Sequence, residues 1–264
     1  MDKPVITVQG EDEALLHVDI QTAFMPEHIW RNSPVLAGGL PVPGGQEILP
    51  VVLQVTRLFP DGALLASLDS HPEDARGSPS GHISWVTSYV GLPVYHNLTL
   101  KEVLTWTDGR HIVSKSFGLE DLKSYLAGVP RQEQTLWPKH AVSGTPGAKL
   151  HPALRGLRFQ EIIFKGQDAR CDSYSAVRDN LGRPTGLVGL LMESEIRRVF
   201  VDGLAYTHCV GWTALDLAAA GFETFVIRDA TRSVPIPGLE DEMTRQLLAA
   251  GVRLIDSDQL QRGW

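Results

Sequence analysis

The stretch RVFVDGLAYTHCVGWTALDLAAA, residues 198–220, decides the fold class, because a strand pattern passes within a few residues into a helix pattern. Arg198–Gly203 is a short run rich in β-branched residues, as buried parallel strands require. Val210–Ala220 then shows the apolar pattern of a helix. Because a strand followed by a helix is the repeating unit of α/β proteins, this stretch favours an α/β fold.

Strand and helix patterns alternate along much of the chain. Helical patterns cover Gln46–Phe59, Leu187–Ile196 and Leu239–Ala250, and Pro50 is tolerable only if it lies in the first turn of its helix. This alternation predicts a doubly wound, six-stranded, mainly parallel sheet with helices on both faces. The six predicted strands are Ala14–Asp19, Ala63–Leu68, Glu161–Phe164, Arg198–Gly203, Thr224–Arg228 and Val252–Ile255.

One connection of the predicted sheet is unusually long. The crossover between the second and third strands runs from about Asp69 to Gln160, far beyond the length of an ordinary strand-to-helix loop. We expect a single domain over residues 1–264, with an insert at about 89–134. The insert is interpreted as a lid or an oligomer contact, and the alternative is a surface excursion without a function.

The insert has local structure of its own in the sequence pattern. Val103–Thr107 and Arg110–Val113, joined by Asp108-Gly109, are predicted to form a β-hairpin with a type I′ turn. Gly118–Gly128 is predicted to be a short helix.

Composition restricts the class of protein and its partners. The 264 residues include 24 Lys and Arg against 31 Asp and Glu, a formal charge of −7. An acidic chain without a basic run does not favour nucleic acid or an anionic membrane as a partner. The N-terminal residues lack the apolar segment of a signal peptide, and two cysteines, Cys171 and Cys209, cannot form a disulfide framework. We expect a cytoplasmic enzyme.

Reactive side chains follow four of the predicted strands. Asp19, Asp69 with His71, Lys165 and Cys209 all lie at or just after strand ends. The carboxyl ends of parallel strands meet at one edge of the sheet, which is where ligands bind in such folds. We therefore expect these side chains to converge on one site.

Three of these residues suit nucleophilic catalysis. Cys209 opens a helix, where the helix dipole and unpaired N–H groups lower the pKa of a thiol. Asp19 could accept the thiol proton and later protonate an amine leaving group, and Lys165 could stabilise the thiolate. The alternatives are an inert buried cysteine, a structural or helix-capping carboxylate, and a surface lysine.

Asp69 and His71 form a possible metal site. Residues two apart on a strand point to the same side, so a single ion can bind both. His82 and His140 lie in the same long connection and could complete the ligand set. A carboxylate with imidazoles suits Zn²⁺, Mn²⁺ or Fe²⁺ rather than Ca²⁺. Asp-x-His alone is a weak signal that often arises by chance.

Taken together, these motifs resemble the nicotinamidases (pyrazinamidases) of the isochorismatase-like cysteine hydrolase superfamily, over nearly the whole chain apart from the insert. The most diagnostic match is the W-P-x-H segment followed by G-T-P-G-A. The matching segments are Val18-Asp19-Ile-Gln21-Thr-Ala-Phe24, Leu68-Asp69-Ser-His71, Gly81-His82-Ile-Ser84, Trp137-Pro-Lys-His140, Gly144-Thr-Pro-Gly147-Ala148, Phe164-Lys165-Gly166, Asp172-Ser-Tyr-Ser175 and Gly203-Leu-Ala205-Tyr-Thr-His208-Cys209-Val210.

The resemblance implies an amidase that works through a thioester. Cys209 would be the nucleophile, Asp19 the proton carrier and Lys165 the third member of a triad. One divalent transition metal, expected to be zinc with manganese or iron as alternatives, would bind the ring nitrogen of nicotinamide. The implied ligands are Asp69, His71 and His140, with His82 bound directly or through water.

The resemblance also implies a pocket and an oxyanion hole. The family carries a cis peptide before the residue that matches Ala205, which would aim the N–H groups of Ala205 and Cys209 at one oxyanion. Phe24 and Trp137 are expected to be aromatic walls for a flat pyridine ring. Tyr206 is a further candidate for the pocket.

The implied function is hydrolysis of nicotinamide or pyrazinamide in NAD salvage, by a homo-oligomer. The alternative is a sister amidase that acts on another heteroaromatic or carbamoyl amide. Departures from the family pattern bear on this choice, because they affect the shape of the pocket: Ala141, Thr207 and Val177 stand where other residues are usual. A vinyl-ether hydrolase would not need Cys209, and a catalytically silent binding protein would be free to lose the triad.

Overall fold

The computed structural model describes residues 4–72 and 81–264. Its central feature is a six-stranded sheet in the order β11-β10-β9-β2-β5-β8, in which every neighbouring pair is parallel. The predicted six-stranded sheet is therefore confirmed. Its strands are β2 (Glu13–Val18), β5 (Leu64–Asp69), β8 (Glu161–Lys165), β9 (Arg198–Leu204), β10 (Glu223–Arg232) and β11 (Arg253–Ile255).

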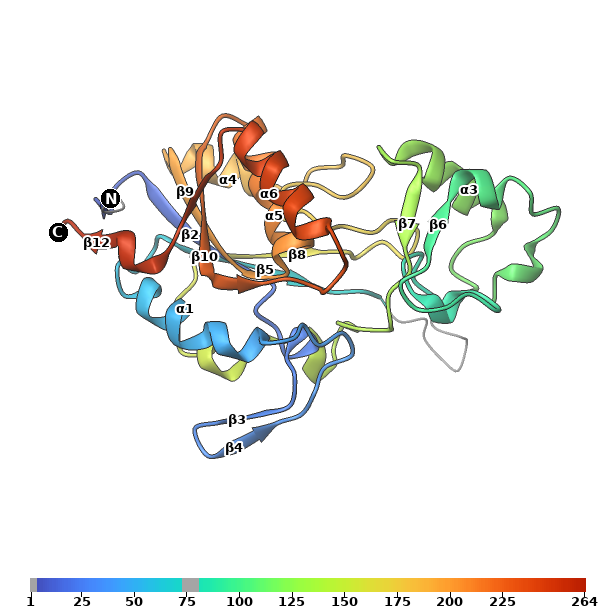
Figure 1. Cartoon of the computed structure of the whole chain (residues 1–264), viewed down its shortest axis with the longest axis horizontal. Coiled ribbons are helices and arrows are strands. Elements are labelled where there is room, and N and C mark those ends of the chain that lie inside the picture. Colours follow the sequence, from blue (N-terminus) through green and yellow to red (C-terminus); the bar gives the residue numbers. More distant parts are fainter. Residues whose placement is uncertain (1–3, 73–80) are drawn as a thin grey trace.

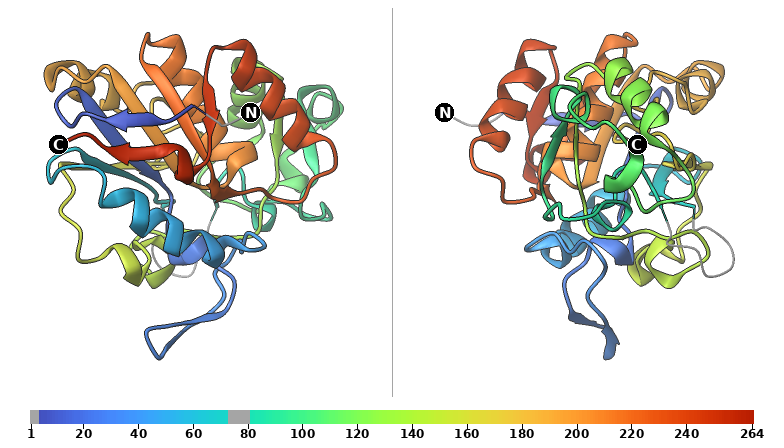
Figure 2. Two further views of the ribbon diagram at one scale, coloured as in Figure 1. Left: turned by 60° about the vertical axis from the view of Figure 1, so that its left-hand side comes forward. Right: turned by 90° about the vertical axis from the view of Figure 1, so that its right-hand side faces the viewer.

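Helices cover both faces of this sheet (Figures 1 and 2). Helix α1 (Leu49–Thr56) lies on one face. The helices α4 (Leu187–Glu193), α5 (Gly211–Ala219) and α6 (Leu239–Ala249) lie on the other. Pro50 falls in the first turn of α1, as its missing N–H requires. No helix in the described residues has the length and hydropathy to cross a bilayer.

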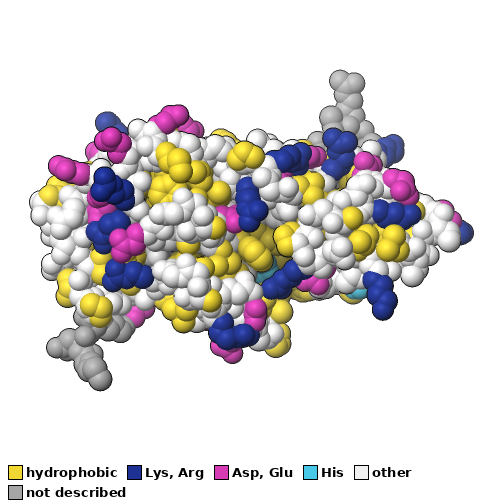
Figure 3. Space-filling view, turned by 90° about the horizontal axis from the view of Figure 1, so that it is seen from above, with side chains coloured by type: hydrophobic (Ala, Val, Ile, Leu, Met, Phe, Trp, Pro, Cys, Tyr) yellow, Lys and Arg dark blue, Asp and Glu magenta, His cyan; other side chains and the backbone are white. Residues whose placement is uncertain are grey.

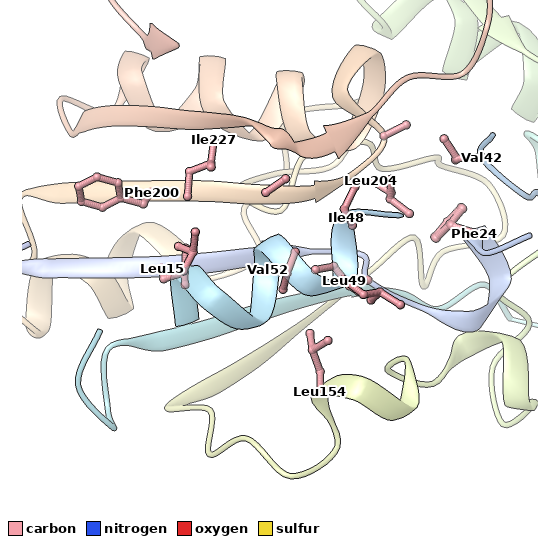
Figure 4. Packing of buried hydrophobic residues seen from close by; sticks show 14 of the residues in the cluster. Leu15, Phe24, Val42, Ile48, Leu49, Val52, Leu154, Phe200, Leu204 and Ile227 are labelled. Atoms are coloured by element: carbon pink, nitrogen blue, oxygen red, sulfur yellow. The ribbon is translucent and has the colours of Figure 1, made fainter. Parts of the chain in front are cut away.

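The alternation of side chains along each strand builds two hydrophobic cores. Leu15 and Phe200 pack with α1 on one face (Figure 4). Their neighbours Leu16 and Val201 pack with α5 and α6 on the other. Strands buried on both faces need apolar residues at every position, which is why they appear in the sequence as continuous apolar runs.

The chain order places the switch point of the sheet between β2 and β9. In chain order, β5 and β8 are added on one side of β2. The chain then crosses to the other side of β2 and adds β9, β10 and β11 there. Ligands of open α/β sheets bind in the crevice outside the carboxyl ends at such a point. Asp19 and Cys209 follow these two strands, so the topology brings them to this crevice.

The insert lies beyond the carboxyl ends of the sheet strands (Figure 1) and has a hydrophobic cluster of its own. It contains α2 (Leu100–Val103) and α3 (Leu119–Gly128), the latter close to its predicted range. Its two short strands, β6 (Asn97–Thr99) and β7 (Glu133–Thr135), pair antiparallel across most of the insert.

The hairpin predicted from Val103–Thr107 and Arg110–Val113 is wrong. Val103, the first residue of the predicted hairpin, is the last residue of helix α2. Thr99 caps this helix by accepting a hydrogen bond from the Glu102 N–H. The Asp108 carboxylate accepts from the Arg110 N–H and caps a short 3₁₀ turn instead of a hairpin turn.

The remaining strands lie outside the central sheet. Near the chain ends, β1 (Ile6–Val8) pairs in parallel with β12 (Leu260–Arg262). The strands β3 (His28–Trp30) and β4 (Ser33–Val35) form a hairpin that projects from the molecule (Figure 2). On the face shown in Figure 3, acidic and basic side chains are interspersed.

A buried histidine holds the base of this hairpin. His151 accepts a hydrogen bond from the Ala153 N–H at Nδ1, and its Nε2 lies 3.1 Å from Nε2 of His28. Burial, reinforced by the charges of His28 and Arg155, lowers the pKa of His151 to about 4. The folded protein therefore favours neutral His151, whereas the unfolded chain protonates at about its ordinary pKa of 6.5.

This difference predicts a loss of stability in acid. The contribution of His151 should be complete above about pH 6.5 and should fall as the pH drops toward 4, because the unfolded state then binds the extra proton. Between pH 7 and 5 the free energy of unfolding should decrease by about 2 kcal/mol from this group. Urea denaturation at pH 7 and pH 5 should show a smaller decrease in the free energy of unfolding for His151→Gln than for the parent, by about 2 kcal/mol. An equal decrease in the two proteins would contradict the lowered pKa of His151.

Candidate active site

The predicted catalytic side chains come together at the carboxyl edge of the sheet. Asp19 follows β2 with a left-handed backbone (φ 49°), and Lys165 is the last residue of β8. Cys209 lies in a π-helical turn, Tyr206–Val210, between β9 and α5. All three side chains are buried.

Lys165 is the centre of this cluster. Its Nζ lies 2.9 Å from Oδ2 of Asp19, 3.1 Å from Oδ1 of Asp69 and 3.5 Å from Sγ of Cys209. The ammonium group thus touches two carboxylates and the thiol at once. Ser67 donates to the other oxygen of Asp19, at 2.7 Å, and so fixes the orientation of that carboxylate.

Burial dominates the proton affinities of the cluster. It raises the pKa of Asp19, and the Lys165 charge offsets this only in part. Burial alone would lower the pKa of Lys165, but the two carboxylates raise it well above its ordinary value. The result is a lysine that stays charged beside a carboxylate of increased basicity.

The expectation of a lowered thiol pKa is wrong. Burial raises the pKa of Cys209 well above its ordinary value, and Lys165 opposes this shift only in part, while Asp19 and Asp69 add to it. The position at a helix start favours the thiolate. Burial of the sulfur and the two nearby carboxylates favour the neutral thiol, and their effect on the pKa is larger. Cys209 therefore rests as a thiol, and a base must remove its proton when it reacts.

Asp69, His71 and His140 form a second cluster beside the first. Oδ2 of Asp69 lies 2.9 Å from Nε2 of His71 and 3.3 Å from Nε2 of His140, and the two Nε2 atoms are 3.3 Å apart. Burial opposes ionisation of Asp69, but His71 and Lys165 hold the pKa of that carboxyl well below its usual range. Asp69 thus connects this cluster to Lys165.

The histidines of this cluster are oriented as metal ligands are. Nδ1 of His71 lies 3.0 Å from the Gly166 carbonyl oxygen, and Nδ1 of His140 lies 2.7 Å from that of Pro138. A carbonyl oxygen requires N–H at Nδ1, so the metal would replace the proton at Nε2, and both Nε2 atoms face Asp69. These three residues fit a divalent transition metal.

His82 adds a fourth possible ligand. Its Nδ1 lies 2.8 Å from Oγ of Ser84, and its buried Nε2 has no hydrogen-bond partner among the described residues. Its ring centroid is 4.2 Å from that of His71. Potential ligand atoms of His71, His82 and Asp172 also lie within 4.8 Å of one another. A buried imidazole nitrogen without a partner is costly unless something binds it.

Gly166 allows a close approach to the possible metal ligands. Its φ is +67°, and a Cβ added there would lie 2.7 Å from the His71 ring and 2.8 Å from Oδ1 of Asp69. Gly166→Ala should therefore displace the ligands and weaken metal binding by about 10- to 100-fold, as loss of supporting contacts commonly does. Competition with a coloured chelator measures the dissociation constant.

A matched control for this substitution is Gly221→Ala. Gly221 has a φ of +95° but open space around its Cβ position, so it shares the backbone strain without touching a ligand. Its variant should bind metal as the parent protein does. Equal metal affinity of Gly166→Ala and the parent would contradict the prediction.

A small, largely apolar pocket connects the two clusters. Phe24 and Trp137 line it, and Figure 4 shows Phe24 and Val42 near the end of β9. The peptide bond between Leu204 and Ala205 is cis, as the family resemblance implies. The lining residues are Phe24, Leu40, Val42, Asp69, Trp137, His140, Asp172, Tyr174, Ala205, His208, Cys209 and Val234.

Tyr206 is not among the lining residues, which corrects the prediction for that position. The π-helical turn directs its side chain toward α6, where its hydroxyl lies 2.8 Å from Oγ1 of Thr244. Its ring packs in the core on that face of the sheet, under Arg228. Tyr174 and His208 complete the aromatic wall instead. Tyr174 was present in the matched segment Asp172–Ser175, whereas Leu40 and Val42 carry no sequence signal.

Comparison with known proteins gives consistent matches. The family model described as the isochorismatase domain matches residues 119–259. The chain is 31% identical to a nicotinamidase of Acinetobacter baylyi over 250 residues, which covers 94% of each protein.

Solved structures of similar proteins extend over nearly the whole chain. One is PnC1 from L. infantum in complex with nicotinate, at 30% identity and a TM-score of 0.70, covering 98% of this chain and 99% of that one. Another is the pyrazinamidase of Pyrococcus horikoshii in complex with zinc, at 26% identity and a TM-score of 0.60, covering 93% and 99%.

Proposed function

The chain belongs to the isochorismatase family, among its nicotinamidases, and we propose that it hydrolyses nicotinamide to nicotinate and ammonia through a thioester on Cys209. One observation carries this proposal. Lys165 contacts Asp19, Asp69 and Cys209. Cys209 and Asp69, together with His140, line the same small apolar pocket. A nucleophile, a base and a metal-binding cluster thus lie close enough to act on one small bound molecule.

The first half of the reaction forms the thioester. Asp19 takes the proton of the Cys209 thiol as the sulfur attacks the carboxamide carbon. Lys165 stabilises the negative charge passing between them. The N–H groups of Ala205 and Cys209 are proposed to donate to the carbonyl oxygen as it becomes an oxyanion. The C–N bond then breaks, and Asp19 returns its proton to the departing nitrogen, which leaves as ammonia.

The second half hydrolyses the thioester. Asp19 takes a proton from a water molecule as the water oxygen attacks the thioester carbon. The C–S bond breaks, the proton held by Asp19 returns to the sulfur, and the nicotinic acid that forms releases its proton to solvent as nicotinate. The raised pKa of Asp19 suits both roles, because an acid–base catalyst works best when its pKa lies nearer to the working pH.

Asp69, His71 and His140 are proposed to hold the metal, with His82 as a further ligand. When bound, the metal would supply a Lewis acid for the pyridine nitrogen of the substrate. Zinc is proposed on the donor set and on the zinc complex of the P. horikoshii pyrazinamidase. The walls from Phe24 and Trp137 would hold the flat ring. Participation in NAD salvage follows from this reaction.

Comparison of two amides tests the proposed substrate. Benzamide has the shape of nicotinamide but lacks the ring nitrogen, so a site that binds that nitrogen should hydrolyse nicotinamide at a much higher kcat/KM. A loss of one good polar contact commonly changes kcat/KM by about 10²-fold or more. Equal rates of ammonia release from the two amides would instead favour a sister amidase of broader specificity.

The homo-oligomeric state and the cytoplasmic location stay predictions. So does the single-domain organisation with its insert at about 89–134.

A further inference from the structure

Gln134, in strand β7 of the insert, joins the insert to the active site. Its side chain is buried, and its Nε2 donates to Oδ2 of Asp172 at 2.9 Å and to the Thr135 carbonyl oxygen at 2.8 Å. The same Nε2 lies 3.2 Å from the Tyr174 hydroxyl. Asp172 and Tyr174 both line the pocket that holds Cys209.

The surroundings determine which way the Gln134 amide faces. Asp172 and the Thr135 carbonyl present oxygen acceptors, so the nitrogen must lie toward them. The oxygen Oε1 then faces the Tyr125 hydroxyl, which donates to it. Asn180 donates to that same hydroxyl from its Nδ2 at 3.1 Å, which leaves the Tyr125 proton for Gln134.

Tyr125 ties this chain of hydrogen bonds to the core of the insert. It lies on α3, and its ring is buried in the hydrophobic cluster that Leu98, Val103 and Leu122 also form. The chain therefore runs from the insert core, through Tyr125 and Gln134, to Asp172.

The two groups that Gln134 holds lie at functionally important places. The carboxylate of Asp172 lies within 4.8 Å of ligand atoms of His71 and His82. Its other oxygen accepts from the Ser173 N–H at 2.9 Å. The hydroxyl of Tyr174 also accepts a hydrogen bond from Nε1 of Trp137 at 3.1 Å. This bond links the Tyr174 and Trp137 side chains, which both line the pocket.

We propose that Gln134 is a positioning residue, through which the insert sets the Asp172 carboxylate beside the metal-binding histidines and fixes the ring of Tyr174 in the pocket wall. This inference rests on the proposed function for its kinetic part only. It gives the insert a role as a fixed support of the site, carried by one buried amide with four polar neighbours.

Three variants test the proposal. Gln134→Leu keeps a similar volume but removes every hydrogen bond of the amide. Tyr125→Phe removes a single hydroxyl and should fold even if Gln134→Leu does not. Thr99→Ala is the control, because it removes the cap of α2 and destabilises the insert without touching the pocket. Each is measured for Zn²⁺ affinity by competition with a coloured chelator, and for KM and kcat with nicotinamide.

Gln134→Leu should bind Zn²⁺ about 10- to 100-fold more weakly, the usual cost of removing a group that orients the surroundings of a metal. Its KM for nicotinamide should rise by a larger factor than its kcat falls. Tyr125→Phe should also weaken Zn²⁺ binding and raise the KM, each by a smaller factor than Gln134→Leu does. Thr99→Ala should change neither the Zn²⁺ affinity nor the KM.

The proposal is overturned if Gln134→Leu, or Tyr125→Phe where the former is unfolded, keeps the parental Zn²⁺ affinity and KM. It is equally overturned if Thr99→Ala shifts both as much as they do, because general destabilisation would then explain the effect. If the parent protein does not hydrolyse nicotinamide, the Zn²⁺ affinities still decide the positioning role, so the two failures are distinguishable.

Discussion

Replacement of Cys209 by alanine should abolish ammonia release from nicotinamide while the protein still binds its metal. The thiol is the only group of the protein that forms a bond to the substrate carbon in the proposed mechanism. Loss of a nucleophile that acts with its base commonly lowers kcat by about 10⁴- to 10⁶-fold. The metal-binding side chains come from β5 and the connection after it, so the sulfur is not needed to hold them.

Cys171→Ala is the matched control for this experiment. Cys171 is the other cysteine of the chain, and it is buried with its pKa raised to about 12, chiefly by burial. It packs in the hydrophobic cluster of the insert. Its variant should retain ammonia release and metal. An active Cys209→Ala protein would contradict the thioester mechanism.

Replacement of Lys165 by methionine should destabilise the protein and stop turnover. The substitution keeps the length of the side chain but leaves the buried carboxylates of Asp19 and Asp69 without their shared cation. Breaking a buried ion pair in this way costs about 3–5 kcal/mol in the free energy of unfolding. Turnover should be lost as well, because the charge that stabilises the attacking sulfur is removed.

The effect of Lys165→Met should depend on pH in a defined direction. Without the ammonium, burial should raise the pKa of Asp19 in the folded variant further above that in the unfolded chain. The folded state then binds more protons, so the variant should gain stability relative to the parent as the pH falls from about 8 to 5. Urea denaturation of metal-free protein at both pH values measures this, and a variant as stable as the parent at both would contradict the assigned ion pairs.

Most of the central sheet could be predicted because its strands are buried on both faces. Such strands are continuous apolar runs, and their alternation with helices indicates that they pair in parallel. The strands outside the sheet have three residues each and no such pattern. The pairing of β1 with β12 joins the two ends of the chain, and no local signal announces it.

The insert shows how a local signal can mislead. Asp108-Gly109 favours a hairpin turn, but the Asp108 side chain caps a 3₁₀ turn, and the strand pairing of the insert is made by β6 and β7 far apart in sequence. Long-range pairing of short polar strands depends on the whole insert core. It therefore could not be read from a few neighbouring residues.

The reactive residues of the site were predictable, whereas the groups that support them were not. The convergence of Asp19, Lys165 and Cys209 is predictable because a parallel sheet gathers strand ends at one edge. Ser67 and Gln134 support the site through hydrogen bonds to residues distant in the chain, which no sequence spacing reveals. Tyr206 points toward α6 instead of the pocket because a π-helical turn, rather than a regular helix, follows β9.

The most direct test of the account is ammonia release from nicotinamide by the purified protein, before and after treatment with a chelator and again after Zn²⁺, Mn²⁺ or Fe²⁺ is added back. The account predicts release that stops on chelation and returns with metal, with one nicotinate formed for each ammonia. No release from protein loaded with metal would contradict the central claim that this site is a nicotinamidase.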